Sequence, residues 1–135
     1  MPITDQLRDF ATRYAAAWCS HNSASVASFF APNGWLSIND GPRAQGRSAI
    51  AREAQAFITA FPDMRVTFDR LVQAADAMQF HWTLTGTYTG PGGTGKRVYI
   101  SGFEEWLLGE DGLIAESRGH FDAAEYQRQL QHGAD

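Results

Sequence analysis

Cysteine and long apolar runs are nearly absent from this chain. Its 135 residues include one cysteine, Cys19, which excludes an internal disulfide and a zinc site built from several thiolates. No apolar run approaches the ~20 residues of a membrane span, so we expect no membrane contact. The opening residues, MPITDQLRDF, include acids and lack the apolar segment of a signal peptide, which favours a cytoplasmic location.

Basic charge and metal ligands are also scarce. The chain has 11 Lys and Arg against 15 Asp and Glu, a formal charge of −4, so we expect no nucleic-acid partner. Neither His21 nor His81 has a second His or Cys at ligand spacing, so no metal site is expected. The glycine-rich segment 90–95 joins two predicted strands, which argues against a phosphate cradle, and we expect no cofactor.

Aromatic residues, by contrast, are plentiful. The chain has 4 Trp, 9 Phe and 4 Tyr, which predicts a core or pocket lined with rings. Its 44% hydrophobic and 19% charged residues are typical of a globular protein. The length predicts one domain, residues 1–135, and no linker or internal repeat divides it.

The spacing of apolar residues changes at Pro62. Before it, helical spacing predicts three helices, with one brief strand between the second and the third; after it, alternation predicts four long strands and a short terminal helix. These elements span, in chain order, residues 7–18, 23–30, 35–38, 48–61, 64–73, 78–89, 97–109, 113–121 and 123–130. Helices followed by strands with hairpin-length loops predict an α+β fold. We expect the helices to cover one face of a curved antiparallel sheet and to leave a conical pocket.

Glu104 lies within the strand predicted over residues 97–109. Alternation places it on the apolar face, with Ile100 and Trp106, where an ionised carboxylate is costly to desolvate. Such a group must be paired, neutralised or at the wall of a cavity, so Glu104 is a candidate site residue. The alternative is a β-bulge that turns Glu104 outward and puts Glu105 inside or at the edge.

The order of the predicted elements resembles the NTF2-like superfamily over nearly the whole chain. The resemblance is carried by RYAAAW (13–18), SVASFFAPNGWL (25–36), GRSAI (46–50), FHWTLTGTYTG (80–90), DGLIAESRGHFD (111–122) and YQRQL (126–130). Together these look most like the SnoaL-like polyketide cyclases and, more distantly, like ketosteroid isomerase. The resemblance implies a cone formed by a curved sheet around N-terminal helices, a hydrophobic small-molecule ligand and a homodimer. The superfamily includes isomerases, cyclases, hydrolases, dehydratases and non-catalytic members, so it leaves the function open.

The same resemblance implies roles for particular residues. Tyr14 matches the first-helix tyrosine that donates to the substrate's carbonyl oxygen in the isomerases, and Asp40 matches the aspartate that moves the proton. Glu104 matches a carboxylic acid that is kept protonated to share the oxyanion hole. However, the loop after Asp40 is shorter than in the isomerases. The SnoaL-like cyclases instead place their acid/base aspartate at the position of Asp122, where His120, on the same strand face, would orient it or contact substrate.

Each candidate also has a purely structural interpretation. Tyr14 lies on the apolar stripe of its helix and would pack there. Asp40, between Asn39 and Gly41, would form an Asx turn, and Asp122 would cap the terminal helix. The candidates for the pocket wall would otherwise belong to the core: Trp18, Phe57, Phe61, Trp82 and Trp106.

These residues lead to one main hypothesis and two rivals. The main hypothesis is a cofactor-independent isomerase or cyclase that removes a proton beside the carbonyl of a steroid- or polyketide-like ketone. Either aspartate would be the base, with Tyr14 and Glu104 holding the oxyanion. The rivals are a non-catalytic binding or dimerisation module and an epoxide hydrolase with two aspartates and an arginine, for which Arg118 shares the face of His120. A Thr-rich sheet face is the predicted homodimer interface, with Thr83, Thr85, Tyr99, Phe103 and Glu105.

Overall fold

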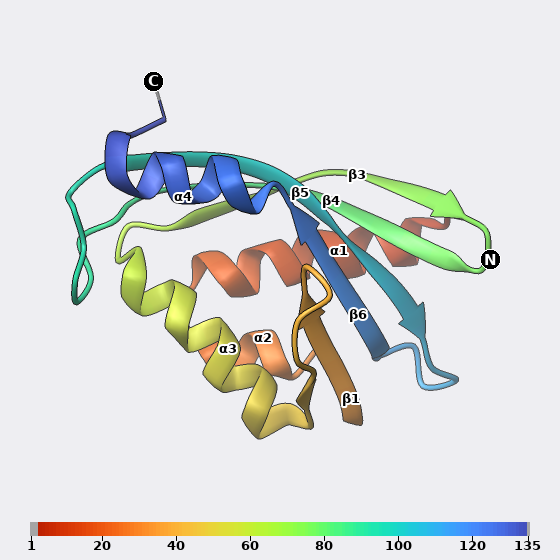
Figure 1. The fold of residues 1–135 in the computed structure, drawn as a ribbon. Helices are drawn as coiled ribbons and strands as arrows, with labels where there is room; N and C mark the ends of the chain where they lie inside the picture. Colours follow the sequence, from red (N-terminus) through yellow and green to blue (C-terminus); the bar gives the residue numbers. More distant parts are fainter. Residues whose placement is uncertain (1–2, 135) are drawn as a thin grey trace.

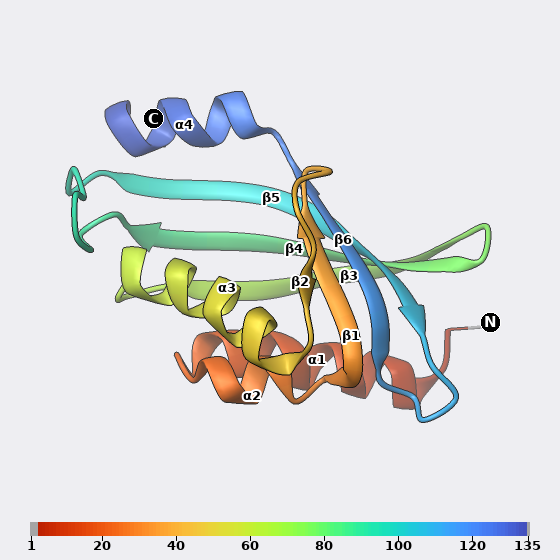
Figure 2. The ribbon, with the colours of Figure 1, turned by 60° about the horizontal axis from the view of Figure 1, so that its bottom comes forward.

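The computed structural model describes residues 3–134 as a curved sheet with three helices gathered on one side (Figures 1 and 2). The elements are α1 (Asp5–Cys19), α2 (Ser23–Ala27), β1 (Phe30–Ile38), β2 (Ala44–Gln45), α3 (Arg47–Ala60), β3 (Arg65–Ala74), β4 (Ala77–Thr87), β5 (Arg97–Leu108), β6 (Ile114–Phe121) and α4 (Ala123–His132). The six strands lie in the order β2-β1-β6-β5-β4-β3. α1 packs against β3, α3 against β1 and α4 against β5. The predicted α+β class is confirmed.

α1 follows directly from its sequence. The Thr4 hydroxyl accepts a hydrogen bond from the Leu7 backbone N at 3.1 Å and so caps the first turn. One stripe of the helix is buried, namely Leu7, Ala11, Tyr14, Ala15 and Ala17. Across residues 3–134, no helix has both the length and the apolar character that crossing a membrane demands.

The segment after α2 differs from the prediction. The helix predicted over residues 23–30 ends at Ala27, and β1 begins at Phe30, before Pro32 and the Asn33-Gly34 pair. The chain stays extended through these turn-forming residues, and the pairing of β1 with β6 is irregular between Phe30 and Trp35. A proline is tolerated in a strand where the regular ladder is interrupted in this way. The two-residue strand β2 is too short to produce an alternating pattern, and it was not predicted.

The sheet is mixed rather than wholly antiparallel. The four long strands, β3 to β6, lie within two residues of their predicted bounds and pair as antiparallel neighbours. β1, however, pairs with β6 in parallel, so the sheet predicted to be antiparallel is antiparallel among its long strands and mixed as a whole. The chain passes through α3 and four further strands between β1 and β6, and such a long connection permits parallel pairing, which a hairpin does not.

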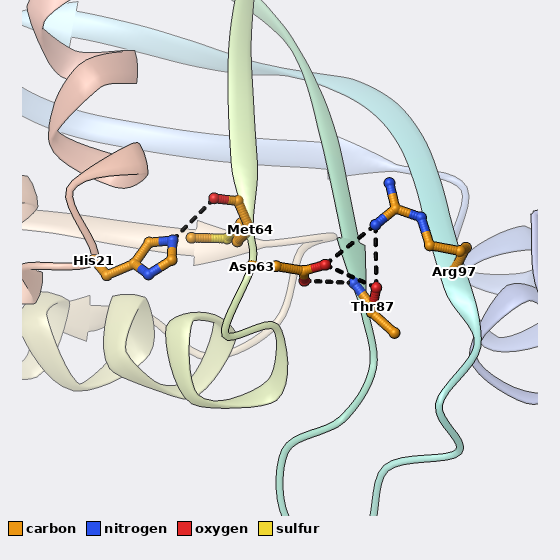
Figure 3. A network of polar contacts seen from close by, with 5 residues as sticks. All are labelled: His21, Asp63, Met64, Thr87 and Arg97. Carbon is orange, nitrogen blue, oxygen red and sulfur yellow. Dashed lines mark hydrogen bonds and ion pairs between the residues drawn. The ribbon is translucent and has the colours of Figure 1, made fainter.

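A polar cluster fixes the corner where α3 leads into β3 (Figure 3). The Asp63 carboxylate accepts hydrogen bonds from the Thr87 backbone N at 2.7 Å, the Thr87 hydroxyl at 2.8 Å and the Arg97 guanidinium at 3.2 Å. The backbone bond from Thr87 is the main cause of a lowered Asp63 pKa. Beside it, His21 Nε2 donates to the Met64 carbonyl at 2.9 Å. The corner is therefore joined to β4, to β5 and to the turn after α1.

The two faces of the sheet differ as the alternation predicts. On β4 and β5 the buried positions include Phe80, Leu84, Val98 and Ile100. On the opposite face Tyr99 is 59% exposed. That opposite face carries the expected homodimer interface, which stays a prediction.

Candidate functional site

A cavity opens between the sheet and the helices. Its wall is drawn from α1, α3, α4 and five of the strands, and it is almost entirely apolar. Six of the lining side chains are aromatic, which agrees with the expectation of a ring-lined pocket. The lining residues are Trp18, Leu36, Ile38, Glu53, Phe57, Val66, Phe80, Trp82, Leu84, Ile100, Glu104, Gly119, Phe121 and Tyr126.

Glu104 is the buried acid of this cavity. It pairs with Phe80 on β4 and with Gly119 on β6, and the register is regular on both sides of it. The only irregularity in the pairing of β5 with β6 falls between Leu107 and Leu108. The bulge that would turn Glu104 outward is therefore absent from β5, and its side chain faces the cavity while only 7% exposed.

Three buried donors hold the Glu104 carboxylate. The Tyr14 hydroxyl lies 3.1 Å from both Oε1 and Oε2. Trp106 Nε1 donates to Oε1 at 3.0 Å, and the Ser117 hydroxyl donates to Oε1 at 2.8 Å. These donors come from α1, β5 and β6, so three separate elements fix the position of one carboxylate. Without such partners, burial of the acid would be strongly unfavourable.

Burial and hydrogen bonding act in opposite directions on this acid. Burial raises the pKa of Glu104, and the bonds from Trp106, Ser117 and Tyr14 lower it, with burial the stronger influence. The pKa of Tyr14 is raised well above its ordinary value, first by burial and then by the charge of Glu104. Tyr14 therefore keeps its proton and remains a donor at physiological pH.

The raised pKa predicts how stability depends on pH. Folded Glu104 holds its proton to higher pH than the unfolded chain does, so the free energy of unfolding should fall as pH rises from about 4.3 through the raised value. Glu104→Gln should remove the contribution of Glu104 to this decrease in the free energy of unfolding. Urea denaturation at a series of pH values measures it, with Glu110→Gln, an exposed residue of the β5–β6 hairpin, as the control. Equal pH dependence in the parent and in Glu104→Gln would contradict the burial of a titrating acid.

Tyr14 donates its hydrogen bond to Glu104 and does not line the cavity. Its side chain is 0% exposed and does not belong to the cavity wall. Its ring packs edge-on against Phe80 at 5.2 Å and Trp106 at 5.3 Å between centroids. Tyr14 and Glu104 were expected to donate together to a ligand. In the structure, Tyr14 instead donates to Glu104 and positions it.

The two aspartates expected to act as the base lie outside the cavity. Asp40 is exposed in the turn after β1 with φ 61°, and Ile38 lines the wall nearby instead. Asp122 is exposed and accepts a hydrogen bond from the Glu125 backbone N at 3.0 Å, as a cap of α4. A one- or two-residue offset at the end of a strand is enough to turn a side chain away from the pocket. Within residues 3–134, no three His, Cys, Asp or Glu side chains are grouped to hold a metal ion.

His120 and Arg118 also do not line the cavity. His120 Nε2 lies 2.7 Å from Glu105 Oε1, and its ring packs on Phe103, which places it on the far face of the sheet. The exposed Arg118 guanidinium lies over the Trp35 ring, 5.0 Å from its centroid. Neither residue can contact a ligand in the cavity, so the assignment of His120 to the pocket wall is corrected.

The aromatic predictions divide into two groups. Trp18, Phe57 and Trp82 line the cavity, whereas Phe61 and Trp106 are buried in the core behind it, at 0% and 1% exposure. Sequence reasoning missed several contributors that the structure brings together: Glu53, Phe80, Ser117, Gly119, Phe121 and Tyr126. The alternation of β6 carried a usable signal, since it places Ser117, Gly119 and Phe121 on one face.

A curved sheet with helices on one side and an apolar cone between them is the arrangement of the NTF2-like class of folds. Within it, a family model for SnoaL-like polyketide cyclases matches residues 8–130, and the chain belongs to this family. The match begins within α1, ends within α4 and covers every element between them. No curated protein matches the chain significantly.

Solved structures share this fold at low sequence identity. A protein predicted to be a SnoaL-like polyketide cyclase, from Jannaschia sp. CCS1, is 17% identical, with a TM-score of 0.82 over 98% of this chain and 96% of that one. A protein of ketosteroid isomerase-like fold from Catenulispora acidiphila DSM 44928 is 17% identical, with a TM-score of 0.78 over 90% and 92%. SalBIII, an epoxide hydrolase/cyclase-like enzyme with a role in pyran ring formation in the polyether salinomycin, is 16% identical, with a TM-score of 0.73 over 90% and 96%. At these identities the likeness shows the fold alone.

Proposed function

We propose that this protein is a small isomerase or cyclase in which Glu104 carries a proton to and from a hydrophobic carbonyl compound. One observation carries the proposal. Glu104 is a buried carboxylate held by three donors, and it faces an apolar cavity that is open to a ligand. Neither predicted aspartate lines that cavity, so the proton-transfer role passes to Glu104.

The chemistry needs only this carboxylate. Ionised Glu104 takes a proton from the carbon next to the carbonyl: the C–H bond breaks, an O–H bond forms on Glu104, and the electron pair moves onto the carbonyl oxygen as an enolate. In an isomerisation, Glu104 returns the proton to a different carbon. In a cyclisation, the enolate carbon attacks a second carbonyl of the same molecule, and Glu104 gives its proton to the new alkoxide.

The surroundings of Glu104 suit this role. A general acid/base works best when its pKa is close to the operating pH, and burial moves the pKa of Glu104 upward in that direction. The bonds from Tyr14, Trp106 and Ser117 keep the carboxylate oriented while it gains and loses charge. These three are positioning residues. Membership of the cyclase family supports a cyclisation, as does the ring-forming role of SalBIII.

Isotope exchange tests the proposal directly. The protein is incubated in D₂O with a bicyclic aryl ketone (α-tetralone) or a steroid enone (androstenedione), and deuterium incorporation beside the carbonyl is followed by NMR. We expect exchange above the buffer rate, rising with pH around a midpoint above about 4.3, the ordinary glutamate pKa. Exchange no faster than buffer for every ketone, under conditions in which the ketone binds, would reject the proposal.

A second candidate is a binding module without catalysis. The observation in its favour is the wall itself, in which, among the described residues, only Glu53, Glu104, Tyr126 and the indoles of Trp18 and Trp82 carry polar side-chain atoms. Such a wall is sufficient to bind an apolar molecule. Ligand binding without deuterium exchange would favour this candidate.

A further inference from the structure

The charged residues of the cavity wall are all acidic. Its ionisable residues are two carboxylic acids, Glu53 and Glu104, and one phenol, Tyr126. No Lys, Arg or His is among the described residues that line the cavity. Burial raises the pKa of Tyr126 to about 12, so its hydroxyl stays neutral and does not alter this balance.

Glu53 is placed differently from Glu104. It lies on α3, one helical turn before Phe57, and both residues line the cavity. Glu53 is exposed, whereas Glu104 is buried, so Glu53 lies where the cavity meets solvent. Within residues 3–134, no hydrogen bond or ion pair engages its carboxylate, in contrast to the three donors on Glu104.

We propose that the ligand of this cavity is a hydrophobic molecule with a protonated amine, which binds to Glu53 at the mouth of the cavity. Its apolar body fills the ring-lined interior and brings a carbonyl group to Glu104, so the inference rests on the proposed function and names its substrate class. The ammonium gains from the Glu53 carboxylate and from the ring faces close to it, which attract cations. Phe57, one turn along α3 from Glu53, supplies such a ring, and Trp18 packs against Phe57 with the ring centroids 6.3 Å apart.

The same wall excludes anions. A carboxylate or phosphate that entered would lose water without meeting any basic side chain, and it would lie near two acids of its own charge. A neutral ligand avoids this cost but leaves the Glu53 carboxylate without a partner. The order of affinity expected for otherwise similar molecules is therefore amine, then alcohol, then acid.

Calorimetric titration of three matched probes tests this order: phenylpropylamine, phenylpropanol and phenylpropionate. At low ionic strength, the amine should bind about fivefold more tightly than the alcohol, because an exposed ion pair and a cation–ring contact each contribute modestly. The acid should bind most weakly. Glu53→Gln should bring the amine to the affinity of the alcohol, while Glu110→Gln, a distant exposed acid, should leave the preference intact.

Three results would overturn the proposal: no binding of the amine, equal binding of amine and alcohol in the parent, or an amine preference that persists in Glu53→Gln. These titrations involve no turnover, so they are separate from the exchange assay. An amine preference without any ketone exchange would remove the proposed catalysis and keep the ligand class. Ketone exchange without an amine preference would keep the proposed catalysis and remove the proposed ligand class.

Discussion

Glu104→Gln should slow ketone proton exchange by about a hundredfold to ten-thousandfold, the usual contribution of a general acid/base. Glutamine keeps the size of the side chain and one acceptor oxygen for the bonds from Tyr14 and Ser117. It cannot take a proton at any pH near neutrality. The loss should therefore appear in the rate constant for exchange, while ligand affinity and the far-ultraviolet circular dichroism spectrum change little.

Two companion variants sharpen this result. Glu105→Gln changes the next residue, whose carboxylate points to the opposite face and pairs with His120, and it should exchange at the parent rate. Tyr14→Phe removes one of the bonds that lower the pKa of Glu104, so the midpoint of the rate against pH should move upward. An unchanged rate in Glu104→Gln, or equal losses in the Glu104 and Glu105 variants, would show that the proton is carried elsewhere.

Gly119→Leu should weaken ligand binding by about fivefold to a hundredfold, which corresponds to the ~1–3 kcal/mol typical of overfilling a packed site. Gly119 lies directly opposite Glu104 on β6 and lines the cavity. Residues paired across two strands point to the same face, so a leucine there would occupy the space beside the carboxylate. Titration with phenylpropanol measures the loss.

Gly119→Ala provides the graded control for this substitution. A Cβ at this position would approach the Ser37 carbonyl to 3.4 Å and Ile38 Cγ1 to 4.0 Å, both ordinary contacts. Alanine should therefore fold normally and lose only a small part of the affinity. Parent-like binding in Gly119→Leu, with its thermal stability retained, would mean that the ligand does not occupy the space next to Glu104.

The sequence was sufficient to place the acid, because strand alternation is a local property. Val98, Ile100 and Trp106 surround Glu104 at period two, and a regular register maintains that pattern across β5. Helical spacing likewise put Tyr14 on the buried stripe of α1. Alternation does not predict which side chains donate hydrogen bonds to Glu104. Ser117 reaches Glu104 only because β6 pairs beside β5.

The aspartates could not be assigned from sequence for a different reason. Asp40 lies two residues beyond the end of β1 and Asp122 one residue beyond the end of β6, where the direction of a side chain depends on individual backbone angles instead of a repeating pattern. The positive φ of Asp40 turns it into solvent, and Asp122 turns to cap α4. The sequence also does not show which inward-facing residues line the cavity and which are buried in the core. Trp82 and Trp106 both lie at inward-facing strand positions, but of these two only Trp82 lines the cavity.

The hydrogen bond between Tyr14 and Glu104 spans 90 positions of the chain, and it constrains the order of assembly. During synthesis, α1 leaves the ribosome long before β5 exists, so its tyrosine has no acid to bind. Contacts of such long range form late, after the hairpins between them have closed. α1 can therefore pack against α2 and β3 early, but it completes its buried hydrogen bond only after β5 has been synthesised.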